Sequence, residues 1–382
     1  MKILIIGAGI GGLCAGLALR RLGHDIEIFE KVREMRPVGA GLSLWPNGIR
    51  CLQHLGLGPD VEALGGQMET MAYVDGLSGA GMTDFSLQPL YDASGARAYP
   101  VSRAALQDRL IDRFGREEIH FGAELLTAAQ DGTATFSNGM QAQGDLIIGA
   151  DGAHSAIRSH ILGSPLSRRS AGYTNWNGIV PADPAIAPVT SWTTYVGEGK
   201  RVSIMPIGAG KCYYFFDVPR PAGGEAPADR LAELRGHFSH WCQPVQCLLD
   251  AISTDSLNRV EIHDIDPIGT WVNGRMVLLG DSAHNTAPDL GQGACMAMED
   301  AVVLERALTQ YPDDLDAALA SYQAARVDRC AELVLRARVR SDITHGIDPA
   351  LTKDWYRSLT ADAAGEILQG IQKTVDGGPL AV

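Results

Sequence analysis

At the start of the chain, the apolar and polar positions alternate between a pattern typical of strands and a pattern typical of helices. Residues 2–6 form a short apolar run, residues 11–22 carry a helical pattern, and residues 25–30 return to a strand-like pattern. These patterns predict a buried strand, a helix and a second strand. This order is typical of the opening of a βαβ unit.

The middle of the chain is rich in short strands, whereas its end is helical. Residues 145–149 and 275–280 are apolar strands, each leading into Gly and Asp. Four segments between them predict strands of an antiparallel sheet: Tyr173–Val180, Thr193–Val196, Val202–Met205 and Cys212–Phe216. From about residue 292 the pattern is mostly helical. The strand-rich part therefore interrupts a domain that resumes near residue 265, and a ligand site is expected in the cleft between the two parts.

Charge and composition narrow the classes of partner. Of the 382 residues, 46% are hydrophobic, 20% are charged, and the formal net charge is −13. Such a chain repels nucleic acid and anionic membrane surfaces, so neither is an expected partner. The apolar runs are too short for a transmembrane helix. An anionic substrate would need a local cationic residue to overcome the acidic background.

The seven cysteines are scattered, with no CxxC pair and no zinc spacing. An odd number in this arrangement suits reduced thiols better than a disulfide framework. We therefore expect a cytoplasmic protein without a bound metal.

A glycine-rich turn follows the first predicted strand. Residues 7–12 read GAGIGG, and Glu30 ends the second strand. Gly7 permits the tight turn, Gly9 lets a pyrophosphate approach the helix N-terminus, and Gly12 lets the helix pack on the strand. Glu30 can accept hydrogen bonds from a ribose hydroxyl. Together these features predict a dinucleotide-binding site, although they do not distinguish FAD from NAD.

Two later segments decide between these cofactors. Residues 149–158 read GADGAHSAIR, and residues 280–284 read GDSAH, followed by PDLGQG at 288–293. In this order they resemble the fingerprints of the flavoprotein aromatic hydroxylases. The resemblance implies that Asp281 binds the FAD ribityl chain and that Asp151 has a mainly structural role near the pyrophosphate. Taken singly, each Asp could instead be a turn residue or a helix cap.

The same resemblance implies that Arg103 contacts FAD. It also gives a role to Gly291 and Gly293, which precede a helix-like run from residue 294 to 308. A helix beginning there would direct its positive end at the flavin and stabilise negative charge on the reduced ring. A second GxGxxG turn is missing, which is consistent with NADH as a transient co-substrate, although the sequence does not separate NADH from NADPH.

The predicted fold is α/β, with a Rossmann-type FAD-binding domain, an inserted and mainly antiparallel sheet domain for the substrate, and a helical C-terminus. We expect the discontinuous FAD-binding domain to contain residues 1–70, 100–170 and 265–330. The substrate sheet would contain residues 71–99 and 171–264, and the C-terminal helices residues 331–382.

Within the hydroxylases, the chain resembles the bacterial FAD-dependent urate hydroxylases. The stretches that carry this resemblance are WPNG at 45–48, NWNG at 175–178, YVGEGKRV at 195–202, EIHDI at 261–265 and DITHG at 342–346. The resemblance implies that Arg201, Tyr213 and Asp289 line the substrate site.

The chemistry of these residues suits urate, a planar monoanion rich in N–H and C=O groups. A guanidinium such as Arg201 offers paired donors and a positive charge. Tyr213 could supply a hydroxyl or an aromatic wall, and Asp289 could accept N–H groups. Without the resemblance, Arg201 would be a surface charge, Tyr213 a packing residue and Asp289 part of a turn.

The activity implied is hydroxylation of urate at C5 by molecular oxygen, through a flavin C4a-hydroperoxide, to give 5-hydroxyisourate. Benzoate or salicylate-type phenols are an alternative substrate class, because Arg201 could also pair with a carboxylate. A flavin reductase or oxidase and a non-catalytic flavin-binding redox sensor are further alternatives.

The arginines near the C-terminus lie on a predicted helix whose apolar positions follow a helical spacing. We expect them to form a solvated face or a subunit contact, with the protein a monomer or a homodimer. The arginines are Arg326, Arg329, Arg336, Arg338 and Arg340.

Overall fold

The N-terminal pattern forms the centre of a six-stranded sheet. The computed structural model describes residues 1–35, 40–223, 227–361 and 363–381. The strands are, in sheet order, β17 (Val272–Asn273), β18 (Met276–Leu278), β11 (Leu146–Gly149), β1 (Lys2–Ile6), β2 (Asp25–Glu30) and β7 (Ile119–Phe121). All neighbours are parallel except β17 and β18. Strands distant in sequence therefore share one core, and the βαβ prediction is confirmed.

Helices cover this sheet and bury its apolar strands. The principal ones are α1 (Ile10–Arg20), α5 (Arg103–Phe114), α10 (Gly293–Gln310) and α11 (Leu315–Thr344). The side chains of Ile3, Leu4 and Ile5 have no solvent exposure. Because both faces of the sheet are covered, its strands are apolar throughout rather than alternating.

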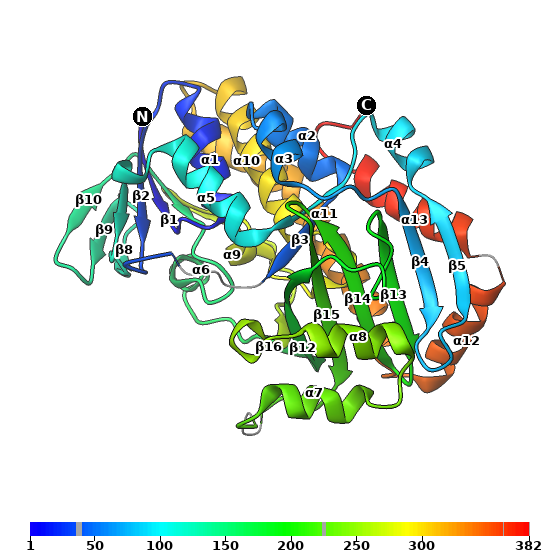
Figure 1. The fold of residues 1–382 in the computed structure, drawn as a ribbon. Helices are drawn as coiled ribbons and strands as arrows, with labels where there is room; N and C mark the ends of the chain where they lie inside the picture. Colours follow the sequence, from blue (N-terminus) through cyan, green and yellow to red (C-terminus); the bar gives the residue numbers. More distant parts are fainter. Residues whose placement is uncertain (36–39, 224–226, 362, 382) are drawn as a thin grey trace.

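A seven-stranded sheet forms the other half of the molecule (Figure 1). Its strands are, in sheet order, β16 (Asn258–Asp264), β12 (Arg169–Pro181), β15 (Lys211–Pro219), β14 (Lys200–Ile207), β13 (Ser191–Gly197), β4 (Thr70–Asp75) and β5 (Gly81–Ser86). Only β13 and β4 are parallel; the other pairs are antiparallel. The four predicted middle strands are all present.

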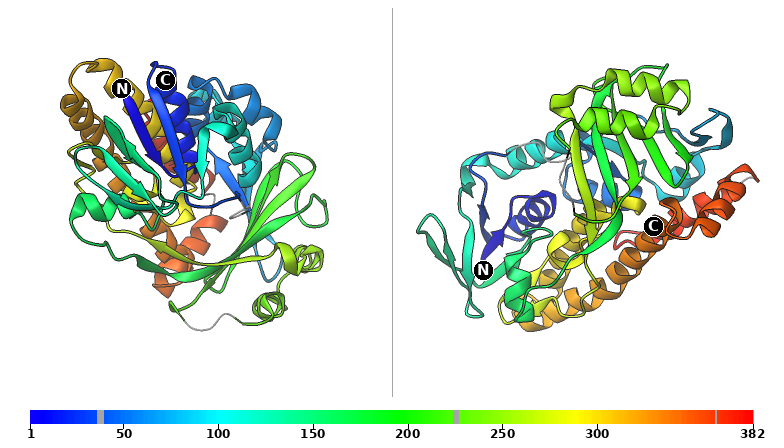
Figure 2. Two further views of the ribbon diagram at one scale, coloured as in Figure 1. Left: turned by 90° about the vertical axis from the view of Figure 1, so that its left-hand side faces the viewer. Right: turned by 90° about the horizontal axis from the view of Figure 1, so that it is seen from below.

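The two faces of the seven-stranded sheet differ in chemistry. One face is apolar and lies under α7 (Arg230–Phe238) and α8 (Gln243–Ala251), where Trp176, Tyr214 and Phe216 form part of a buried core (Figure 2). Successive strand residues point to opposite faces, so the alternate residues of the same strands form the second face. That second face carries buried polar side chains, among them Asn175, Arg201 and Asp217, and Arg201 pairs there with Asp289 of η3 (Pro288–Leu290).

The remaining elements are smaller. The remaining strands are β3 (Gly41–Leu44), which pairs with β6 (Tyr99–Ser102), and a three-stranded sheet of β8 (Leu125–Ala128), β9 (Thr133–Phe136) and β10 (Gln141–Gln143). The remaining helices are α2 (Pro46–His54), α3 (Gly58–Leu64), α4 (Gln88–Ser94), α6 (Ala156–Leu162), α9 (Asp281–His284), α12 (Pro349–Thr360) and α13 (Ala364–Asp376), with short 3₁₀ turns η1 (Arg116–Glu118), η2 (Thr254–Ser256) and η3 (Pro288–Leu290). None of the helices described here is long and apolar enough to cross a bilayer.

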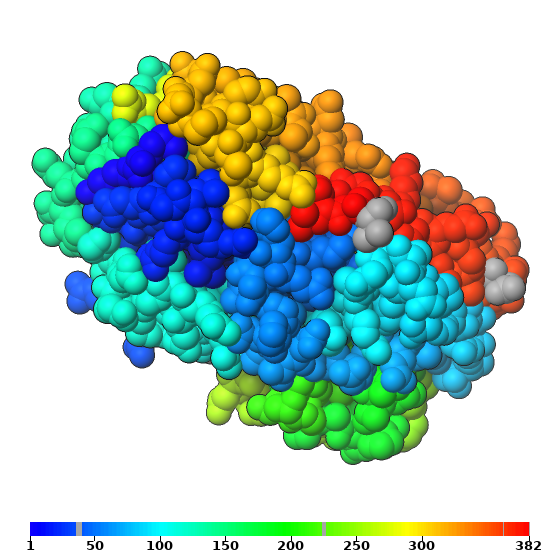
Figure 3. Space-filling view, turned by 90° about the horizontal axis from the view of Figure 1, so that it is seen from above, coloured from blue at the N-terminus to red at the C-terminus, as the bar shows by residue number. Residues whose placement is uncertain are grey.

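The C-terminal helices return to the body of the protein. Seen from above, the last segment lies between α10 and the segment that holds α2 and α4 (Figure 3). Arg329 donates to the carbonyl of Thr374 at 3.0 Å, and Arg50 donates to that of Val375 at 3.1 Å. The C-terminus therefore closes over helices from both ends of the chain.

The prediction that the arginines of α11 form a solvated face or a subunit contact is wrong for Arg326 and Arg338. Arg326 is 1% exposed and donates to Asp300 at 2.6 Å and to Glu299 at 2.8 Å. Arg338 pairs with Asp264 at 2.8 Å. The reason is that α10 and β16 present buried carboxylates to α11, and a buried carboxylate requires a partner cation. A helix pattern alone does not reveal what the neighbouring element presents.

Candidate functional site

The glycine turn between β1 and α1 excludes side chains where backbone segments cross. Gly7 has φ +111°, and a Cβ there would lie 2.3 Å from the carbonyl oxygen of Ala150. A Cβ on Gly12 would lie 2.1 Å from the carbonyl oxygen of Gly7. At Gly9, which caps α1 without a side-chain hydrogen bond, nothing lies within 4 Å. The helix N-terminus is thus open to an anionic group at Gly9.

Glu30 lies at the edge of the same opening. Its carboxylate accepts from the backbone N–H of Ala8 at 2.8 Å and from that of Val32 at 3.1 Å. A cavity of about 220 Å³ adjoins both Gly9 and Glu30. The cavity is also lined by Ala123, Glu124, Leu125, Ala150, Asp151, Gly152, His154 and Ala156. A cavity that contains both an open helix N-terminus and a carboxylate matches a pyrophosphate and a ribose.

Asp151 is engaged in capping α6. Its carboxylate accepts from the hydroxyl of Ser155 at 2.5 Å and from the backbone N–H of Ala156 at 2.7 Å. These bonds satisfy N–H groups that the helix itself leaves without partners. The side chain is therefore occupied within the protein, while the backbone around it lines the cavity.

Asp281 and the N-terminus of α10 lie side by side. A Cβ built on Gly293 would lie 3.9 Å from Oδ1 of Asp281. The helix starts at Gly293 with no side-chain cap on Gln292, and Gly291 has φ +62°. No hydrogen bond or ion pair found among the described residues uses the Asp281 carboxylate, so this end of α10 combines an available carboxylate with uncapped N–H groups, as a ligand with both a hydroxylated chain and developing negative charge requires.

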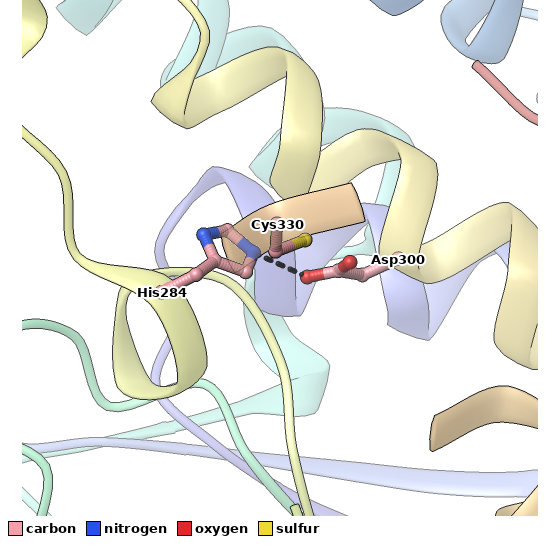
Figure 4. A group of neighbouring side chains, drawn as sticks. All are labelled: His284, Asp300 and Cys330. Atoms are coloured by element: carbon pink, nitrogen blue, oxygen red, sulfur yellow. Dashed lines mark hydrogen bonds and ion pairs between the residues drawn. The ribbon is translucent and has the colours of Figure 1, made fainter. Parts of the chain in front are cut away.

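A buried ion-pair network lies directly behind this loop. Asp300 accepts from the backbone N–H of Gly280 at 2.8 Å and from His284 Nε2 at 2.8 Å (Figure 4). Burial raises the pKa of Asp300, but the charges of His284 and Arg326 outweigh it and lower that pKa to about 2. The network ties the Asp281 loop to α10 and α11.

Three residues of this network are of types that can bind a metal ion. His284, Asp300 and Cys330 offer ligand atoms within 4.8 Å of one another. Arg326, however, donates to Asp300 at 2.6 Å and to the Cys330 sulfur at 3.3 Å. A guanidinium already supplies the positive charge that a metal ion would bring, so the arrangement is a structural ion-pair network.

Arg103 connects the cofactor side to the substrate side. It begins α5, and one turn later Gln107 donates to the carbonyl of Ala8 at 2.9 Å. Residues four apart lie on the same helix face, so Arg103 lies on the face that meets the glycine turn. Burial raises the pKa of Tyr213, and the charges of Arg201 and Arg103 act in the opposite direction. The backbone N–H of Arg103 donates to the carbonyl of Ala40 at 3.2 Å, which joins the start of α5 to the residue before β3.

The polar face of the seven-stranded sheet holds Arg201 between two carboxylates. Arg201 is 8% exposed, and both carboxylate side chains are fully buried. Its Nη2 lies 2.6 Å from Asp217 Oδ2 and 3.1 Å from Asp289 Oδ1, and its Nε donates to Asp217 at 2.8 Å. Asn175 supports Asp217 with a hydrogen bond of 2.6 Å. The charge of Arg201 is therefore already compensated within the protein.

Asp289 collects side chains from three elements. Tyr173 of β12 donates to its Oδ2 at 2.8 Å, and Nε2 of His345, at the end of α11, lies 3.4 Å from its Oδ1. Burial raises the pKa of Asp289, but Arg201 and His345 outweigh it and hold that pKa well below its usual value. Asp289 is thus an ionised acceptor at the junction of β14, β12 and α11.

Tyr213 lies on the polar face and packs against β3. A Cβ on Gly41 would fall 2.5 Å from Tyr213 Cγ, so the ring lies directly against this glycine. Tyr214 belongs to the opposite, apolar core. Strand alternation thus places the two tyrosines on opposite faces of the sheet.

Three residues of this cluster were not anticipated from the sequence: Tyr173, Asp217 and His345. Tyr173 could have been found from the sequence, because Tyr173, Asn175 and Asn177 are every second residue and therefore share one face of a strand. His345 lies in a stretch that supports the family resemblance, but its chain position gave no indication that it meets Asp289.

Known proteins resemble this chain over its whole length. A model of the FAD binding domain family matches residues 1–337. The FAD-dependent urate hydroxylase of Mycolicibacterium vanbaalenii is 50% identical over 100% of this chain and 98% of its own length. That of Klebsiella pneumoniae is also 50% identical, over 100% of both chains. The chain belongs to the family of FAD-dependent urate hydroxylases.

The fold of this family member matches a solved structure closely. The crystal structure of Klebsiella pneumoniae HpxO complexed with FAD and uric acid superposes with a TM-score of 0.97 at 49% identity, covering 100% of this chain and 98% of the other. A salicylate hydroxylase substrate complex, at 21% identity and a TM-score of 0.77, shares the fold. This family member is thus an FAD-dependent monooxygenase, and the open glycine turn, the cavity beside it and the uncapped α10 N-terminus fit FAD.

Proposed function

We propose that this enzyme hydroxylates urate at C5 to 5-hydroxyisourate, with NADH as the reductant and molecular oxygen as the oxygen donor. The observation that carries the proposal is the Arg201–Asp289 pair, which joins the polar face of the substrate sheet to the loop that precedes α10. The relatives named above, which are half identical over the whole chain, support the choice of substrate.

Residues 1–70, 100–170 and 265–330 form the FAD-binding part in this proposal, and residues 71–99 and 171–264 the substrate part. Gly7, Gly9 and Gly12 hold the pyrophosphate, Glu30 the adenosine ribose, Asp281 the ribityl chain, and the N-terminus of α10 at Gly291 and Gly293 the pyrimidine edge of the ring. Bound FAD supplies the chemistry that transfers one oxygen atom of O₂ to the substrate.

Arg201 acts as a fixed donor rather than as a free positive charge. Its Nε and Nη2 are committed to Asp217 and Asp289, and none of the hydrogen bonds found among the described residues uses its Nη1. Nη1 is therefore the atom that can donate to a urate carbonyl. Because two carboxylates hold the guanidinium, this donor keeps a fixed direction.

Asp289 complements Arg201 as an acceptor. Its pKa is held well below the usual value, so it stays ionised and can accept a urate N–H. A donor and an acceptor side by side match the alternating C=O and N–H edge of a purine better than they match a carboxylate. This pairing favours urate over a benzoate or salicylate-type phenol.

Tyr213 forms the wall of the site that faces β3 and Arg103. Its ring packs on Gly41 and lies 5.6 Å, centroid to centroid, from Phe215. Aromatic walls hold a planar ligand by its faces and exclude water from the reacting carbon. Exclusion of water keeps reducing equivalents from being lost as hydrogen peroxide.

All seven cysteines are free thiols, and five of them are buried in the core clusters: Cys14, Cys51, Cys212, Cys295 and Cys330. Burial raises the pKa of Cys14 to about 12 and that of Cys295 to about 12. Free thiols persist in a reducing compartment, which supports a cytoplasmic location. Whether the enzyme works as a monomer or a homodimer stays a prediction.

The test is oxygen uptake by the purified enzyme with NADH, comparing urate, xanthine and salicylate, while hydrogen peroxide is measured in parallel. We expect urate alone to stimulate uptake strongly with little peroxide. Stimulation by salicylate but not urate would overturn the choice of substrate. Uptake that yields only peroxide with every compound would indicate an oxidase, and an absence of any response would indicate a binding protein. A parallel assay with NADPH decides the reductant.

A further inference from the structure

The buried groups around Arg201 do not balance in charge. One guanidinium faces two fully buried carboxylates, Asp217 and Asp289, which leaves a net charge of −1. An uncompensated buried charge is costly. It would also repel an anionic substrate, on top of the negative charge of the whole chain. The cluster therefore needs a second cation.

His345 is the group placed to supply it. Its side chain is fully buried, and Nε2 lies 3.4 Å from Asp289 Oδ1. Neither ring nitrogen has a well-directed hydrogen bond within the described part of the chain. Its ring stacks on Tyr173 with centroids 3.8 Å apart, and the Tyr173 hydroxyl donates to the same carboxylate. A protonated imidazole gains from both the carboxylate and the aromatic face.

The other charged groups near His345 are engaged elsewhere. Asp289 of η3 and Tyr173 of β12 face the ring directly, and Arg201 of β14 lies behind Asp289. The turn between β13 and β14 presents the backbone of Gly199, while its charged neighbours Glu198 and Lys200 pair with each other at 2.9 Å. On α12, Tyr356 accepts from the Gly199 N–H at 3.1 Å.

We propose that the protonated form of His345 is the cation that lets this site accept an anionic substrate. The inference rests on the proposed function, because it concerns the binding of urate. Protonation brings the cluster of Arg201, Asp217, Asp289 and His345 to neutrality, and loss of the proton returns it to −1. His345 acts through Asp289 and is a positioning residue. The residue that follows α11 thereby contributes to substrate binding.

The sign of the pH dependence follows. As pH rises and His345 loses its proton, the KM for urate rises, whereas the affinity for FAD does not change. The kcat at saturating urate should change much less than KM, because His345 does not touch the reacting atoms.

The experiment measures urate-dependent NADH oxidation from about pH 6 to about pH 8.5 in three forms of the FAD-loaded enzyme. These are the natural protein, His345→Gln and His345→Lys. In His345→Gln we expect the urate KM to be raised on the order of tenfold at the low end of this range and to lose its pH dependence. In His345→Lys, where the cation is kept, we expect the KM to stay low across the range.

The matched control is His54→Gln, which removes another histidine–carboxylate contact, that of His54 with Glu305 at 2.6 Å, at a distant position. The control should retain the natural pH profile. A rising KM with pH that persists unchanged in His345→Gln would overturn the inference while leaving the proposed function intact. An identical KM shift in both glutamine variants would also overturn it. No response of the natural protein to urate would overturn the proposed function itself and the inference with it.

Discussion

Two buried clusters of arginine and carboxylate differ in how many arginines meet the carboxylates. Behind the Asp281 loop, Arg326 and Arg329 face Glu299 and Asp300, so two arginines meet two carboxylates, and His284 is a further partner of Asp300. In the substrate cleft, Arg201 alone meets two carboxylates.

The difference separates structure from function. A balanced cluster has no charge left for a ligand and gains only by holding α10 against α11. An unbalanced cluster costs stability, and a protein keeps such a cost where it serves binding or catalysis. Substitutions in the two clusters should therefore affect different measurements.

The largest effect is expected from Arg326→Met. Removing this fully buried cation leaves Glu299 and Asp300 short of a partner, which should lower the free energy of unfolding by about 3–5 kcal/mol. Thermal unfolding of the FAD-loaded protein measures the loss. The urate KM of the remaining folded enzyme should change little; a large KM change without loss of stability would erase the distinction between the clusters.

Arg201→Ala should lower kcat/KM for urate by about 100-fold, because it removes the fixed donor and leaves two carboxylates facing the substrate. FAD should remain bound, as shown by the visible absorbance of the purified protein. Arg338→Ala, which breaks the Asp264 pair outside the cleft, is the control for loss of a buried arginine. Unchanged urate kinetics in Arg201→Ala would remove this residue from the site.

The cluster around Asp300 should also make the stability of the protein depend on pH in acid. The pKa of Asp300 is lowered to about 2, so its stabilisation is complete above the ordinary value and is lost as pH falls from about 4 towards 2. The loss should be on the order of 2 kcal/mol. Unfolding curves measured at several acid pH values test this. Asp300→Asn should have a lower free energy of unfolding at neutral pH, and this free energy should change less between about pH 4 and 2 than in the natural protein. If the variant lost as much stability in acid as the natural protein, the effect would belong to other carboxylates.

The smallest effect is expected from Asp217→Asn, which removes one carboxylate charge from the cleft while keeping an acceptor for Arg201. In the natural background, where His345 already balances the cluster, it should change the urate KM by only about two- to fivefold, because lost positioning and the added positive charge act in opposite directions on an anionic substrate. In the His345→Gln background it should lower the raised KM. Strictly additive effects of the two substitutions would contradict a shared charge balance.

Much of the cofactor side could be predicted from the sequence, because its constraints are local. Gly7 adopts a positive φ in the turn after β1, Gly12 lies against the carbonyl of Gly7 within the same βαβ unit, and Glu30 ends the adjacent strand. Such positions are fixed by chain geometry over a few residues. The order of the Asp151 and Asp281 motifs then identified the family.

The balance of charges was decided by tertiary structure alone. The helical pattern of α11 predicted that its arginines would meet solvent, yet α10 and β16 present carboxylates to them. The cleft cluster is likewise assembled from distant elements. Asp217 lies on β15 and Asp289 on η3, and only folding brings Arg201 of β14 and His345, at the end of α11, to these two carboxylates. A sequence fixes which charges a chain carries, whereas the packing of distant elements decides which charges are neutralised and which are left for a substrate.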